Sequence, residues 1–82
     1  MKKWKYMPNA EEAKVNEALG LIIENKEVKA LNYAVNYAKY GLRMTGDELK
    51  TQCLYVLNNM AYWRGAEAKF VRTTLKAFCG IK

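Results

Sequence analysis

The chain has 82 residues, with 14 lysines and arginines against 8 acidic residues and no histidine, which gives a formal net charge of +6. This length suffices for one compact core that buries roughly 60% of the surface of the unfolded chain. The longest uncharged stretch, residues 51–63, contains polar amides and falls short of the roughly 18 apolar residues of a membrane span, so we expect no membrane-spanning helix.

Residues 1–8 form a basic N-terminal arm, in which Lys2, Lys3 and Lys5 surround Trp4. The arm starts like a signal peptide, but no apolar run of about 7 to 15 residues and no small-residue cleavage site follows it. We therefore expect the protein to be cytoplasmic.

The first helix is expected over residues 10–24. Asn9 can cap it, and Glu12, three residues on, can reach back to Asn9 in a capping box. The apolar positions fall on one side at helical spacing. They are Val15, Ala18, Leu19, Ile22 and Ile23.

The second helix is expected over residues 27–41 and ends at Gly41. It is the most regular segment of the chain, because its apolar positions alternate in steps of three and four. They form one seam: Val28, Leu31, Val35, Ala38 and Leu42.

The third helix is expected over residues 46–63. Thr45 and Glu48 have the spacing of a second capping box, with Thr45 as the cap. Gly65 can close this helix in a left-handed conformation. The apolar seam is Leu49, Cys53, Val56, Met60 and Trp63, widened by Leu54 and Leu57.

The fourth helix is expected over residues 66–79, with Gly80 at its end. Its seam is Ala68, Val71, Leu75 and Phe78. Four amphipathic helices joined by short turns predict an all-α fold, a compact bundle with antiparallel or orthogonal packing. Residues 1–82 are expected to form a single helical domain, because no linker or repeat divides them.

A row of cationic and amide side chains follows the second helix outside its seam, with Tyr33, Tyr37 and Tyr40 on a neighbouring stripe. Such a row beside phenols can contact phosphates and hydrogen-bond to base edges. The same pattern is typical of a solvated helix face with half-buried tyrosines. This first basic row consists of Lys29, Asn32, Asn36, Lys39 and Arg43.

A second basic row, Lys69, Arg72 and Lys76, lies on one side of the fourth helix. Charge is unevenly distributed, since residues 9–27 carry a net −3 while residues 28–82 carry a net +6. A basic half attracts polyanions or acidic protein surfaces, although a charged face often serves solubility alone. Nucleic acid and an acidic protein surface are therefore the two candidate partners, and a homo-oligomer would add stability.

Asn58 and Asn59 stand late in an otherwise apolar helix, although asparagine is a mediocre helix former. One of them is expected to face inward and to join a buried hydrogen-bond network with Tyr33, Tyr37, Asn36 or a neighbouring backbone. Alternatively, the two asparagines line a small polar pocket.

The residues needed for catalysis or metal binding are missing from the sequence. There is no histidine and no glycine-rich phosphate loop, and the carboxylates of the first helix read as a solvated face. Cys53 and Cys79 cannot complete a zinc site unaided, and buried thiols fit them better than a disulfide. We expect no enzyme, no catalytic residue, no metal and no cofactor.

Two segments, ALNYAVNYA at residues 30–38 and LYVLNNMAYWRG at residues 54–65, are followed by Glu67-Ala68-Lys69. They resemble a family of short phage and prophage accessory proteins of gut-type Gram-positive bacteria, and the likeness covers most of residues 28–79. The resemblance implies an accessory gene product in the host cytoplasm, in the size range of small DNA-binding regulators and of inhibitors of host defence such as anti-CRISPR proteins. It implies no activity and no site residue.

Two functions from different classes follow. The first is binding of nucleic acid or a nucleoprotein complex, largely through phosphates, by both basic rows and the N-terminal arm with Trp4. The second is inhibition of a host defence or replication complex by docking on an acidic protein surface, with exposed aromatic side chains as anchors. The candidate anchors are Trp4, Tyr37, Tyr40, Tyr62 and Trp63. Capture of a nucleotide between subunits around Asn58 and Asn59 is an outlying third possibility.

Overall fold

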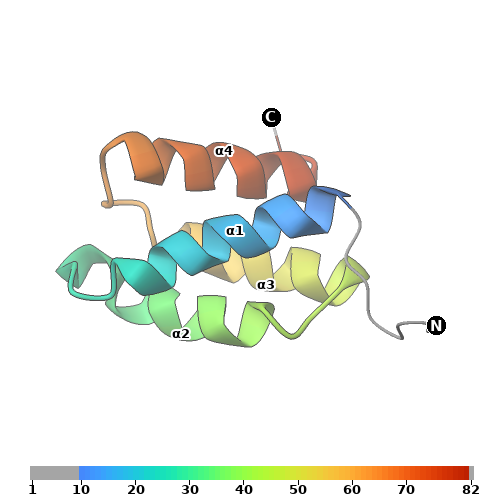
Figure 1. Cartoon of the computed structure of the whole chain (residues 1–82), viewed down its shortest axis with the longest axis horizontal. Helices are drawn as coiled ribbons and strands as arrows, with labels where there is room; N and C mark the ends of the chain where they lie inside the picture. The colour runs from blue at the N-terminus through green and yellow to red at the C-terminus, as the bar shows by residue number, and fades with distance from the viewer. Residues whose placement is uncertain (1–9, 82) are drawn as a thin grey trace.

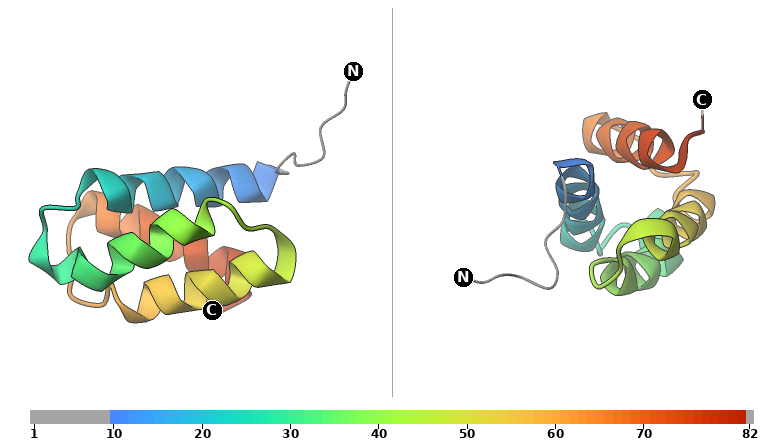
Figure 2. Two further views of the ribbon diagram at one scale, coloured as in Figure 1. Left: turned by 90° about the horizontal axis from the view of Figure 1, so that it is seen from below. Right: turned by 90° about the vertical axis from the view of Figure 1, so that its right-hand side faces the viewer.

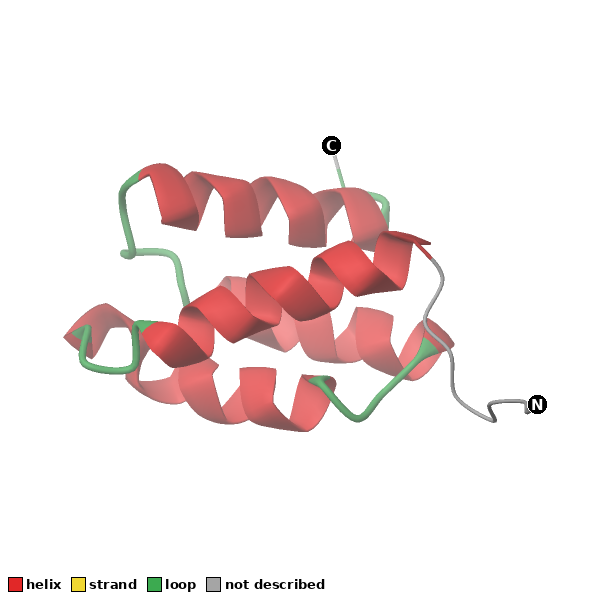
Figure 3. Ribbon diagram, in the orientation of Figure 1, coloured by secondary structure: helices red, strands yellow, loops and turns green. Residues whose placement is uncertain are grey.

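Four α-helices make up the computed structural model, which describes residues 10–81. They are α1 (Ala10–Glu24), α2 (Asn32–Gly41), α3 (Gly46–Asn58) and α4 (Ala66–Cys79), with a short 3-10 turn, η1 (Lys29–Leu31), before α2. Successive helices run in opposite directions, and the part of the chain described contains no strand (Figure 1, Figure 3). The predicted all-α bundle is confirmed, and its packing is antiparallel.

The helices are arranged so that each packs against two others. The pairs α1/α2, α2/α3, α3/α4 and α1/α4 lie side by side, and the view along the bundle shows α2 opposite α4 and α1 opposite α3 (Figure 2). The outward faces of α2 and α4 therefore look in opposite directions.

The predicted seams meet at the centre of this arrangement. The fully buried side chains include Leu19, Ile22, Leu31, Leu49 and Leu75, at least one from each helix or its leading turn. Each large aliphatic side chain buried in this way contributes about 1.5–3 kcal/mol relative to its exposed state. Leu42 is an exception, because α2 ends at Gly41 and the chain turns away, which leaves Leu42 exposed.

Two predicted helix boundaries are wrong. The helix expected over residues 27–41 is helical only from η1 onward, and the helix expected over residues 46–63 stops at Asn58. Asn59 ends α3, where its Nδ2 donates a hydrogen bond to the Tyr55 carbonyl oxygen at 2.8 Å. Met60 and Trp63 leave the helix and still fill the core, so the apolar spacing predicted their burial but not their conformation.

The start of α3 is held by a residue of another helix. Thr45 occupies the cap position with extended backbone angles, but its side chain makes no capping hydrogen bond, so the predicted capping box with Glu48 is wrong. The Gly46 backbone N–H instead donates to Oε2 of the buried Glu12 at 3.0 Å. The capping box predicted for Asn9, and the basic arm with Trp4, lie outside the described residues.

Gly80 ends α4 as predicted, in the left-handed region with φ +78°. The N–H of Gly80 donates to Ala77 O at 3.2 Å and the N–H of Ile81 donates to Lys76 O at 2.9 Å, which is the hydrogen-bond pattern of a Schellman motif. Gly65 does not close α3 as predicted. It lies seven residues beyond the end of α3 and precedes α4, with φ +115°.

A buried amide joins α2 to α3, but it is not one of the predicted asparagines. Nε2 of Gln52 donates to the Tyr37 carbonyl oxygen at 2.9 Å, and Gln52 is buried. Asn58 is exposed and Asn59 bonds only within its own helix end, so the expected inward amide network at these two positions is wrong.

Two glycine-to-alanine substitutions should change stability in opposite directions. Gly20→Ala places a methyl group in open space within α1 and should raise the free energy of unfolding by about 0.5–1 kcal/mol, the helix-propensity gain. Gly80→Ala also meets no neighbouring atom, but it forces a side chain into the left-handed region and should lower stability by about 1 kcal/mol. Urea unfolding measures both, and equal shifts for the two variants would contradict the role assigned to Gly80.

Candidate functional site

The first basic row lies on the exposed side of α2 and its flanking turns. Lys29, Asn32, Asn36, Lys39 and Arg43 are all exposed. The opposite side of the same segment is buried through Leu31, Ala34, Val35 and Ala38, which fixes the direction in which the row faces. The structure therefore brings all five predicted residues onto one accessible surface.

The tyrosine stripe beside this row divides into two kinds. Tyr33 is 72% exposed and Tyr40 is 65% exposed, so both rings are available to a partner. Tyr37 is half-buried and stacks on Tyr55 with ring centroids 5.5 Å apart and planes inclined by 28°. Tyr37 thus supports the contact between α2 and α3 and is no free anchor.

A shallow depression of about 230 Å³ lies at the C-terminal end of the first basic row. Asn36, Lys39, Tyr40 and Arg43 line it. It combines two cations, one amide and one phenol, and no acidic residue occurs in the sequence between Glu27 and Asp47. Within residues 10–81, Lys39 and Arg43 form no side-chain hydrogen bond or ion pair, so their donors are open to an anionic ligand.

The residues of the second basic row differ in their exposure and in their hydrogen bonds. Lys69 is exposed, but Arg72 is half-buried and its Nη2 donates to the carbonyl oxygens of Met60 at 3.3 Å and Trp63 at 2.8 Å. Arg72 therefore holds the segment between α3 and α4, a role that its spacing in the sequence does not indicate. Because α4 lies opposite α2, the structure does not join the two basic rows into one surface.

The predicted aromatic anchors and asparagines also lie in different places. Tyr62 is 84% exposed, whereas Trp63 is only 6% exposed, so Trp63 belongs to the core and is no surface anchor. Asn58 lines a cavity of about 330 Å³ between α3 and α4, and Asn59 does not. Of the two asparagines predicted to line a polar pocket, only Asn58 lines a cavity.

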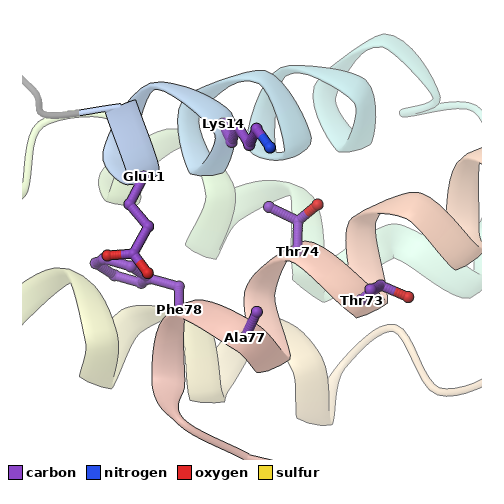
Figure 4. Close-up of a pocket in the computed structure, with 6 residues that line it drawn as sticks. All are labelled: Glu11, Lys14, Thr73, Thr74, Ala77 and Phe78. Carbon is purple, nitrogen blue, oxygen red and sulfur yellow. The ribbon is translucent and has the colours of Figure 1, made fainter.

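A cavity that the sequence did not point to lies between α1 and α4. Its volume is about 310 Å³, and Figure 4 shows the carboxylate of Glu11 beside the Phe78 ring, with Lys14 facing Thr74 across the two helices. The carboxylates of the first helix, Glu11 among them, are typical of a solvated face in the sequence, so the sequence pattern gives no sign of the cavity. It holds one carboxylate and one amine beside hydroxyls, and the described residues contain no group of three side chains suited to a metal ion.

Both cysteines are free thiols. Burial, and to a smaller extent the neighbouring Cys79, raises the pKa of the Cys53 thiol to about 12. Burial also raises the pKa of Cys79, which is half-buried at the end of α4. Neither thiol has the lowered pKa of an activated nucleophile.

No helix within residues 10–81 is long and apolar enough to cross a membrane.

Replacing Arg72 by lysine should lower the free energy of unfolding by about 1–2 kcal/mol, because lysine keeps the charge but cannot reach both carbonyl oxygens in the same geometry. Urea unfolding of the variant provides the measurement. Lys69→Met, which removes an exposed charge from the same helix, is the control and should change stability by less than about 0.5 kcal/mol. An unchanged midpoint for Arg72→Lys would show that these bonds do not hold the segment.

The thiols should differ in reactivity toward iodoacetamide at pH 8. The unfolded chain should label at both cysteines at the rate of an ordinary thiol, since the reactive thiolate forms from a thiol with the reference pKa of 9.0. In the folded protein, Cys79 should label slowly and Cys53 only through unfolding, because the pKa of Cys53 lies near 12. Mass spectrometry of digested samples locates the label, and faster labelling of Cys53 than of Cys79 would contradict its burial.

No protein-family model, no curated protein and no solved structure matches this chain. The resemblance to phage accessory proteins stays a prediction.

Proposed function

We propose that this protein is a small basic binding protein that contacts nucleic acid through the first basic row on α2. The observation that supports the proposal is a single exposed face with three cations, Lys29, Lys39 and Arg43, in a segment without acidic residues. The amides of Asn32 and Asn36 stand between these cations on the same face.

The chemistry of this face suits a phosphate backbone. Lys29 lies in η1, Lys39 lies in α2 and Arg43 follows the end of α2, so the three cations are spread along the whole segment. Lysine and arginine donate charge-assisted hydrogen bonds to phosphate oxygens, and asparagine side chains can contact sugars or base edges. Affinity would come mainly from the release of counterions when phosphates are neutralised, with little dependence on base sequence.

The face on α2 acts without the second basic row in this proposal, because the outward face of α4 points the other way. The basic arm at residues 1–8 and Trp4 could add phosphate contacts and stacking. We further propose a cytoplasmic accessory protein of phage origin, which rests on the resemblance alone.

A second candidate function is inhibition of a host nucleoprotein complex by occupying the groove in which it binds nucleic acid. The exposed rings of Tyr33 and Tyr40 beside the cations favour this candidate, because tyrosine and arginine are the side chains that anchor protein interfaces.

Fluorescence anisotropy of labelled duplex DNA, single-stranded DNA and RNA tests the proposal between about 50 and 200 mM salt. Affinity should fall linearly on a log-log plot. The double variant Lys39→Gln/Arg43→Gln should bind more weakly, with the slope for duplex DNA reduced by about 1.8, or 0.9 for each phosphate contact removed.

The matched control is Lys14→Gln/Lys69→Gln, which removes the same charge from exposed positions on α1 and α4. Its affinity should decrease less and its slope should stay near that of the unmodified protein. Absence of binding to all three nucleic acids at low salt would refute the proposal and favour a protein partner. Equal losses in both double variants would show attraction by net charge without a defined face.

A further inference from the structure

A groove between α3 and α4 has a composition unlike the rest of the surface. Its volume is about 330 Å³, and its walls are mostly apolar, with two cations on one side and one amide. The lining residues are Leu54, Leu57, Asn58, Ala61, Arg72 and Ile81, together with Lys76.

The apolar side chains of this groove are open to solvent. Leu54 and Ile81 are each 41% exposed, and Leu57 is half-buried. The surrounding surface continues the pattern, because residues 51–63 carry no charge although 27% of the chain is charged. An exposed apolar surface with a polar border is typical of a contact site for another protein.

The local structure fixes both ends of the groove. The Schellman motif at Gly80 returns Ile81 toward α4 through its bond to Lys76 O. The early end of α3 leaves Ala61 exposed in the loop, and Arg72 holds that loop by its bonds to Met60 O and Trp63 O. The groove is therefore a formed surface, whose shape does not require a partner.

The charges of the groove have one sign. Arg72 and Lys76 are four residues apart on α4 and so lie one helical turn from each other, and none of the lining residues is acidic. Nη2 of Arg72 is used by the loop, whereas its other guanidinium nitrogens make no hydrogen bond to residues 10–81. The wall formed by α4 thus offers two cationic contacts beside an apolar wall formed by α3.

We propose that this groove binds an acidic amphipathic helix of another protein. Leu54 and Leu57 lie three residues apart on α3, a spacing that apolar anchors of a docked helix would match, and Ala61 lines the same groove from the loop after α3. Two acidic residues one turn apart on the edge of that helix would pair with Arg72 and Lys76. The charge complementarity selects an acidic partner segment, since a basic one would meet like charges.

The two other occupants fit less well. A nucleic acid would place phosphates against exposed leucine and isoleucine side chains, and these would give it no hydrogen bond. A second copy of this chain, docked groove to groove, would offer Arg72 and Lys76 no counter-charge, because none of the lining residues is acidic. An acidic amphipathic helix would pack its apolar side against the apolar wall and pair its acidic residues with the cations.

The proposal is independent of the α2 face. The groove lies between α3 and α4, whereas the first basic row lies on the outward side of α2. Both surfaces can be occupied at once, so the protein would link a polyanion to a protein partner.

A displayed library of helical peptides tests the proposal on the full-length protein. Each peptide has Leu, Ile, Phe or Met at one apolar stripe and random Glu, Lys or Gln at the flanking positions. Peptides retained by the protein should carry two acidic residues one turn apart on one edge of the stripe. Synthetic versions of the retained peptides should bind at least about tenfold more weakly to the Leu54→Glu variant and to the Lys76→Glu variant. The control is Lys69→Glu, which lies on α4 outside the groove and should bind these peptides as the unmodified protein does.

Four results would overturn the proposal. The first is that the protein enriches no peptides beyond those enriched by the Leu54→Glu/Lys76→Glu variant. The second is enrichment of peptides that have no acidic residues beside the apolar stripe. The third is that Lys69→Glu weakens peptide binding as much as Lys76→Glu does, which would indicate attraction by net charge. The fourth is self-association in sedimentation equilibrium that Leu54→Glu abolishes, which would assign the groove to a second copy. Retention of peptide binding by Lys39→Gln/Arg43→Gln is the expected result and separates this proposal from the one for α2.

Discussion

The mutual burial of four apolar seams is the constraint on which the rest of the structure depends. Each helix has one apolar side, and in the ring α1, α2, α3, α4 each of these sides faces the same centre. This packing provides most of the favourable free energy of a small helical domain, because short isolated helices are marginal in water. It also decides what remains outside, since every polar row must lie on the side opposite its seam. The accessible faces of the protein are consequences of the core.

The helices could be predicted from apolar spacing because burial and period are directly linked. The bounds of α1 and α4 coincide with the predicted ones, and the predicted seam residues Met60 and Trp63 are buried. The path of the chain after α3 could not be predicted, because it is held by hydrogen bonds from Arg72, a residue distant in the sequence. For the same reason the buried carboxylate of Glu12 at the start of α3 was missed: residue spacing describes local geometry, whereas these bonds join separate helices.

The candidate surface could be predicted in part. The exposure of the first basic row follows from the helical period of α2, so its five residues were identified correctly as one face. The separation of this face from the second basic row could not be derived, because the order of residues does not state which helices are neighbours in space. The groove between α3 and α4 was missed because Leu54 and Leu57 read as a widening of the core seam. Whether such residues face the centre or a groove depends on where the next helix lies.

The hydrogen bond from Gln52 to the Tyr37 carbonyl oxygen makes the two sides of the bundle unequal in their tolerance of change. In the buried contact of α1 with α4, one aliphatic residue can replace another of similar volume, because dispersion contacts carry no direction and the hydrogen bond from Asn25 to Glu67 at the end of this contact is exposed. Between α2 and α3 a donor must arrive at one carbonyl, and a slide of one helix by a turn would leave a buried amide without its acceptor. Related sequences should therefore drift freely at the α1/α4 contact while the α2/α3 contact keeps an amide at position 52. The helix that carries the first basic row is thus the one whose position the core fixes most strictly.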